Sequence, residues 1–173
     1  MNLPMIRGLH LSALLLCATA THAQTADTHA HAAHQRAAAP SAPSPVVVPL
    51  DAAARASLTR HTVEATAHGQ ALRCEGVALA ALLQANGAMP DGPLRGADLD
   101  RYVLINARDG HRAVFSLGEL DPTLGDRGVY LVDRCDDAPL DADSGPLRVL
   151  VPDDTRPARG LRQVERITVI AAP

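Results

Sequence analysis

Apolar runs and alternating patterns after residue 45 predict a set of short β-strands. Val46–Val48 is a continuous apolar run, and Thr62–Thr66 alternates with a period of two. Such patterns are typical of strands that bury one or both faces. The other strands predicted in this way are Tyr102–Asn106, Arg112–Phe115, Val129–Val132, Leu147–Val151 and Val164–Ile170.

Helices are predicted in fewer and shorter segments. Apolar residues from Val77 to Leu83 lie among alanines before Asn86-Gly87, which is typical of a buried helix with a glycine after its last turn. Shorter helical segments are predicted for Leu50–Leu58 and after Ser116. Asp109-Gly110 predicts a hairpin turn of the primed type, which makes its two strands antiparallel. The fold class is therefore α+β, with a mixed, largely antiparallel sheet and a few short helices.

Residues 1–23 have the pattern of a secretory signal peptide. Arg7 supplies a positive charge, Leu11–Ala20 an apolar run, and Thr21-His22-Ala23 a small-x-small cleavage site. The run is too short for a membrane-spanning helix, which needs roughly 20 apolar residues. We therefore expect a periplasmic or secreted protein without a membrane partner.

The exported part divides into two regions by composition. Residues 24–45 are rich in Ala, His and Pro and lack apolar periodicity, which predicts a disordered linker. Residues 46–173 have the common size of one domain with its own core. The basic residues, 16 in all, are arginines, so lysine Schiff bases and a Walker-type phosphate loop are excluded. The net charge of −3 and the aromatic content of 2% give no reason to expect a nucleic-acid partner.

Four short strings follow one another along the domain. They are Gly76–Leu83, Asn106–His111, Phe115–Leu120 and Gly145–Pro152. In this order they resemble the sulfite-oxidase-type molybdopterin-binding domain, in the form of its short, exported members. The resemblance implies an oxidoreductase fold that holds a molybdenum–pterin cofactor. It also implies a cysteine thiolate on the metal, with arginines around the pterin phosphate and an oxyanion substrate.

The residues that match this family cover only part of its site. Arg148 and Asp109-Gly110 match the pattern, whereas His111 replaces the aromatic residue that commonly follows Asp-Gly. The metal-binding cysteine of catalytic members corresponds to a stretch near Thr62–Gln70, and this stretch has no cysteine. Ala67-His68-Gly69-Gln70 stands there instead. A pterin is therefore expected from the resemblance, molybdenum is doubtful, and no catalytic or metal-binding residue is assigned.

Arginines supply the candidate binding groups. A guanidinium group binds phosphate or another oxyanion through two parallel hydrogen bonds. Surface ion pairs with neighbouring carboxylates are the alternative for any one arginine. The residues that we expect to bind a pterin or another small anionic ligand are Arg108, Asp109, His111, Arg148, Arg156 and Arg159.

Two cysteines, Cys74 and Cys135, remain after removal of the signal peptide. An even pair in an oxidising compartment predicts a disulfide. It would close a loop of about sixty residues and stabilise the domain by roughly 4 kcal/mol in the chain-entropy model. Two unrelated buried thiols are the alternative. A free Cys74 could instead reach a metal, but a cysteine cannot be both a disulfide partner and a thiolate ligand.

Three functions remain open from the sequence. The first is a molybdopterin-dependent oxidoreductase, which the family resemblance favours. The second is a noncatalytic module that binds an anionic ligand or pterin, which the missing cysteine favours. The third is an accessory module for a periplasmic redox partner.

Overall fold

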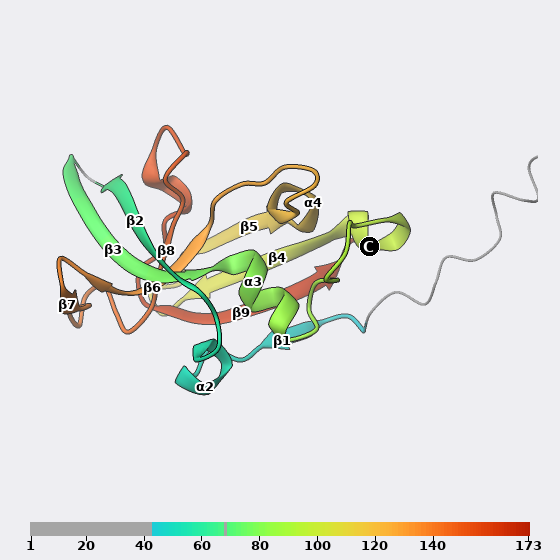
Figure 1. The fold of residues 1–173 in the computed structure, drawn as a ribbon, viewed down its shortest axis with the longest axis horizontal. Coiled ribbons are helices and arrows are strands. Elements are labelled where there is room, and N and C mark those ends of the chain that lie inside the picture. The colour runs from blue at the N-terminus through green and yellow to red at the C-terminus, as the bar shows by residue number, and fades with distance from the viewer. Residues whose placement is uncertain (1–42, 68) are drawn as a thin grey trace, which may run out of the picture. The chain divides into compact units, whose positions relative to one another are not determined.

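Two antiparallel sheets form the frame of residues 43–173, the part of the chain that this computed structural model describes, residue 68 excepted (Figure 1). One sheet has four strands in the order β1 (Val46–Val48), β9 (Val164–Ala171), β4 (Arg101–Ala107) and β5 (Arg112–Ser116). The other contains, in order, β2 (Arg60–Ala67), β3 (Gln70–Ala78), β6 (Tyr130–Cys135) and β7 (Ala138–Pro139), with β8 (Arg148–Leu150) paired to β6. Every pairing among these strands is antiparallel.

Short helices connect the strands. Within the described residues these are α2 (Ala52–Arg55), α3 (Leu79–Ala85), α4 (Leu117–Leu120) and the 3₁₀ helices η1 (Gly96–Asp100) and η2 (Pro157–Arg159). Ser116 Oγ accepts a hydrogen bond from the Glu119 N–H at 3.0 Å, and the Glu119 carboxylate accepts one from the Ser116 N–H at 3.0 Å. This reciprocal cap satisfies two N–H groups at the start of α4. The α+β class and the helical turn after Ser116 are therefore confirmed.

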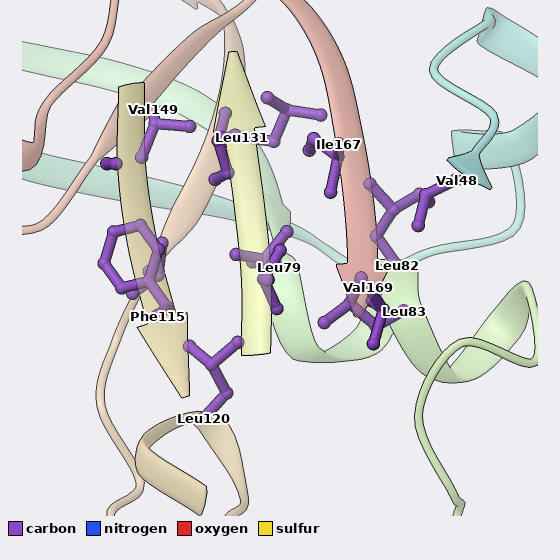
Figure 2. Packing of buried hydrophobic residues seen from close by; sticks show 14 of the residues in the cluster. Val48, Leu79, Leu82, Leu83, Phe115, Leu120, Leu131, Val149, Ile167 and Val169 are labelled. Carbon is purple, nitrogen blue, oxygen red and sulfur yellow. The ribbon is translucent and has the colours of Figure 1, made fainter. Parts of the chain in front are cut away.

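The main core lies where α3 packs against the inner face of the four-stranded sheet. Leu79, Leu82 and Leu83 of α3 are completely buried. Figure 2 shows them gathered with Phe115 of β5 and Ile167 of β9. Because side chains alternate between the two faces of a strand, every second residue of these strands points away from this core.

The pairing of β3 with β6 changes the start of the predicted helix. Val77 lies in β3 opposite Leu131, and α3 begins only at Leu79. The strands approach closely at Gly76, where an added Cβ would lie 2.2 Å from the Leu131 carbonyl oxygen. The prediction of a helix from Val77 is therefore wrong at its start, because strand pairing overrides the alanine-rich pattern.

The β4–β5 turn also differs from its prediction. Gly110 has a φ of 85°, whereas Asp109 does not have a positive φ. The Gly110 N–H donates to the Ala107 carbonyl at 3.0 Å, and the Ala107 N–H donates to the His111 carbonyl at 2.9 Å. This is the pattern of a type I turn followed by a left-handed glycine. The antiparallel hairpin is confirmed, and the primed turn is wrong.

Cys74 and Cys135 are joined by a disulfide, as predicted. They are direct partners in the β3–β6 pairing and lie 61 residues apart in the sequence. Cys74 is completely buried in a small second core with Val63, Val132 and Leu150. The disulfide therefore links β3 covalently to β6, and so joins the β2–β3 hairpin to the rest of the five-stranded sheet.

The start of the described chain is held against the four-stranded sheet. Ser44 Oγ accepts a hydrogen bond from the Ala171 N–H at 2.9 Å, and the Pro43 carbonyl accepts one from Arg101 at 3.1 Å. The signal peptide expected at residues 1–23 and the linker up to residue 42 lie outside the described residues. Among the helices that are described, none has the length and apolar character needed to cross a membrane.

Removing the disulfide should destabilise the domain strongly. The variant Cys74→Ala/Cys135→Ala is expected to lose about 2 to 5 kcal/mol of unfolding free energy, because its unfolded chain is no longer cross-linked. Urea unfolding measures this loss, and the wild-type protein unfolded in excess reductant is the control. If the double variant and the reduced wild type both unfold at the same urea concentration as the oxidised protein, the disulfide does not stabilise the fold.

Candidate functional site

A cleft of about 980 Å³ opens between the β2–β3 hairpin and the loop at residues 152–157. Figure 1 shows this loop, drawn in orange-red, beside the hairpin. The hairpin can form one wall because β2 and β3 pair along their whole length, from Arg60 opposite Val77 to Ala67 opposite Gln70. This pairing therefore fixes the positions of Glu64, Thr66 and Arg73, which line the cleft.

The cleft combines positive and negative side chains. Arg73 on β3 and Arg156 in the loop line it from its two walls, together with Glu64 and Asp136. Arg73 makes only an exposed ion pair with Asp137, at 3.5 Å. Such exposed pairs contribute little free energy, so the Arg73 guanidinium can turn to a ligand at small cost. The cleft thus offers guanidinium donors and carboxylate acceptors side by side.

Arg156 and Arg159 are three residues apart but have different roles. Arg159 donates to Asp154 at 2.7 and 2.9 Å and to Glu119 at 2.9 Å. Its guanidinium carbon also lies 4.6 Å from the centroid of the Phe115 ring. Arg156 is exposed and makes no side-chain hydrogen bond or ion pair with the described residues. Arg159 therefore stabilises the fold, whereas Arg156 is free to contact a ligand.

The ion pair between Arg159 and Asp154 changes the pKa of both groups. Its hydrogen bond holds the pKa of Asp154 below the ordinary value of 3.8, against the opposing effect of burial. The same hydrogen bond to Asp154 raises the pKa of Arg159. Arg127 adds a weaker contact to Asp154 at 3.4 Å. Asp154 lines the cleft, but its negative charge is balanced by Arg127 and Arg159. It therefore does not repel an anionic ligand.

Arg148 is half-buried on β8. Its Nε is buried and has no hydrogen-bond partner among the described residues. Burial lowers the pKa of Arg148, the nearby Arg162 lowers it further, and Asp141 opposes the shift. A buried donor without a partner is unusual in a folded protein. Arg148 is therefore a second place where an acceptor group would be stabilised.

The residues predicted in the β4–β5 hairpin lie elsewhere. Arg108 lines a shallow recess of about 440 Å³ with Arg112 and Arg166. Asp109 Oδ1 accepts a hydrogen bond from the His111 N–H at 2.9 Å, so this carboxylate stabilises the turn. Asp109 and His111 are both exposed and do not line the recess.

The six predicted residues are thus distributed over several places. Arg156 lines the cleft and Arg108 lines the recess. Arg159 forms ion pairs beside Phe115. Sequence reasoning missed Glu64, Arg73 and Asp136. The signal that could have found Glu64 and Arg73 is the pairing of residues 60–67 with residues 70–77, in which they are direct partners. Asp136 follows Cys135, which pairs with Cys74.

The residues beside the cleft do not fit a molybdenum ion bound through a thiolate. Ala67 stands at the end of β2, in the stretch where the family resemblance places the metal-binding cysteine. Cys74 is bonded to Cys135, and a disulfide sulfur is not a thiolate ligand. In residues 43–67 and 69–173, no group of three or more His, Cys, Asp or Glu side chains is arranged to hold a metal ion.

Comparison of the chain with protein-family models and with curated proteins gives no match.

Replacing Arg159 by alanine should lower the unfolding free energy by about 2 kcal/mol, because the partly buried Asp154 loses charge-assisted hydrogen bonds. Since the folded-state pKa of Asp154 is lowered, its contribution is present above the ordinary value of 3.8 and is lost as the pH falls through the folded pKa. Urea unfolding should therefore show the difference from wild type at neutral pH and a smaller difference in acid.

The matched control for this experiment is Arg156→Ala. An exposed arginine without a partner should change the unfolding free energy by less than about 0.5 kcal/mol. Equal losses in the two variants would contradict the separate roles of Arg156 and Arg159.

Proposed function

We propose that the domain binds a small anionic ligand of the pterin phosphate class in the cleft, without molybdenum redox chemistry. The observation that carries this proposal is the state of Cys74, which is completely buried and bonded to Cys135. A molybdenum-binding cysteine of the sulfite-oxidase type acts as a thiolate. The Cys74 sulfur is already bonded to Cys135. The domain therefore has a cleft for a ligand but no thiolate from Cys74 to bind the metal.

The chemistry of the cleft supports a ligand with two kinds of polar group. A pterin phosphate has an aminopyrimidinone edge, which donates hydrogen bonds, and a phosphate, which accepts them. Carboxylates such as Glu64 and Asp136 match the first, and the guanidinium groups of Arg73 and Arg156 match the second. A bare anion would use only the arginines.

The disulfide also supports the proposed location. Disulfides persist in oxidising compartments and are rare in the cytosol. Together with the signal-like pattern of residues 1–23, the Cys74–Cys135 bond favours a periplasmic or secreted protein. The ligand would then be one that is present outside the cytoplasm.

Arg156→Ala should weaken binding of a pterin phosphate about tenfold, because one charge-assisted hydrogen bond contributes about 1.5 kcal/mol. Isothermal titration calorimetry on the exported protein measures this change, with inorganic phosphate as a second probe. Arg108→Ala is the matched control, since it removes a guanidinium from the recess and leaves the cleft intact. A larger loss in Arg108→Ala than in Arg156→Ala would place the anion in the recess and contradict the proposal.

Protein exported by a molybdenum-replete host should contain much less than one molybdenum per chain and show no sulfite-oxidising turnover. Elemental analysis measures the metal in the wild type, in Cys74→Ser and in Cys135→Ser. Both variants lose the disulfide, but only Cys135→Ser leaves Cys74 as a free thiol. Stoichiometric molybdenum that persists in Cys135→Ser and disappears in Cys74→Ser, together with turnover, would show that Cys74 is a metal ligand after all.

A further inference from the structure

A row of three apolar residues and one threonine crosses the outer face of the four-stranded sheet. Val47, Thr168, Leu104 and Val114 are consecutive register partners on β1, β9, β4 and β5. Val47 and Val114, at the two edges, are 63% and 51% exposed. Between them, Leu104 is half-buried and Thr168 is 8% exposed. Apolar side chains that share one face of a sheet favour an interaction surface more than isolated ones do. We call Val47, Thr168, Leu104 and Val114 the outer row.

The charges around the outer row differ between its two sides. Towards one end of the strands, Asn106 pairs with Arg112 on one neighbour and with Arg166 on the other. Neither arginine makes an ion pair with a residue in the described part of the chain. At the opposite end, the exposed Asp100 immediately precedes β4. The arginine end also carries Glu165, which lines the same recess as Arg112 and Arg166 and leaves this end with a net positive charge. Asp100 lies about 20 Å away at 3.3 Å per residue.

We propose that this face packs against the same face of a second copy of the chain. The two-fold axis would lie in the plane between the sheets and run across the strands, between Tyr102 and Leu104. Rotation about this axis reverses the strand direction, so Tyr102 of one copy lies opposite Leu104 of the other. Asp100 then lies opposite Asn106 and comes between the two arginines of the other copy. The result is a closed, self-complementary dimer.

The charge pattern selects this arrangement over the other two-fold packing of the same face. An axis parallel to the strands would bring Arg112 and Arg166 of one copy against the same residues of its partner. Like charges in that position repel each other and oppose association. The net charge of −3 also disfavours an anionic membrane as the occupant of the face.

The size of the face sets the strength of the contact. Four strands at about 4.8 Å spacing make a face about 19 Å wide, and β4 with the residue before it is about 20 Å long, but β1 has only three residues and β5 five. The contact would therefore bury less than about 400 Å² on each copy, which is below the size of a stable interface, so the dimer should be weak and transient. Because the ion pairs lie at the rim of the contact, association should also weaken as salt is added.

Sedimentation velocity on the full exported chain, from about 10 µM to about 1 mM at low salt, tests the proposal over the range expected for small interfaces. The wild type should change from monomer to dimer as the concentration rises. Val114→Asp should raise the dissociation constant at least about tenfold, because it places a charge in the outer row. Leu124→Asp is the control, since Leu124 is 58% exposed but lies outside this sheet, and it should dimerise like the wild type.

Charge reversal separates this dimer from any other association. Arg112→Glu and Asp100→Arg should each weaken dimerisation about fivefold, and the double variant should return to within about twofold of the wild type. A wild type that stays monomeric throughout, whatever else occupies the face, would overturn the proposal. The proposal would also be overturned if the dissociation constant of the double variant rose by the product of the two single changes. Neither result bears on ligand binding in the cleft, which is measured separately.

Discussion

The pairing of β3 with β6, closed by the Cys74–Cys135 disulfide, is the constraint on which the rest of the fold depends. β3 pairs with β2 on one side and with β6 on the other, so the five-stranded sheet cannot form without it. Gly76 permits the close approach to Leu131, and the chain then enters α3, which carries three leucines of the main core. One strand thus connects the second core, the disulfide and the main core.

The same strand determines what the cleft can do. By pairing with β2 it forms the hairpin wall and places Arg73 beside Glu64 and Asp136. Its cysteine is used in the disulfide, and Ala67 stands at the end of the neighbouring strand. In our proposal, the site therefore keeps the polar groups that hold a ligand and lacks the thiolate that catalysis on molybdenum requires.

Local patterns predicted the elements that have a clear short-range sequence signal. The strands at Val46–Val48 and Tyr102–Asn106, the turn after Ser116 and the antiparallel hairpin at Gly110 were all predicted from short-range signals. The cysteine pair was predicted from cell-compartment chemistry and is confirmed. By contrast, β3 was not predicted, because its sequence has no clear alternation and its stability comes from two partner strands and a disulfide.

The candidate site was harder to predict than the fold for the same reason. Arg156 and Arg159 look alike in the sequence, and only the positions of Asp154, Glu119 and Phe115 give them separate roles. Arg73 lines the cleft because β3 pairs with β2, and no sequence motif predicts this pairing. Residue type indicated anion binding, but tertiary structure decides which arginines are available for it.

The central claim is that Cys74 is a structural cysteine and not a metal ligand. Labelling of residues 24–173 with a thiol reagent, after denaturation without reductant, tests this most directly. The structure predicts no labelled cysteine per chain before reduction and two, Cys74 and Cys135, after reduction. Two labelled cysteines in the unreduced, denatured protein would contradict the claim and make Cys74 available as a thiolate.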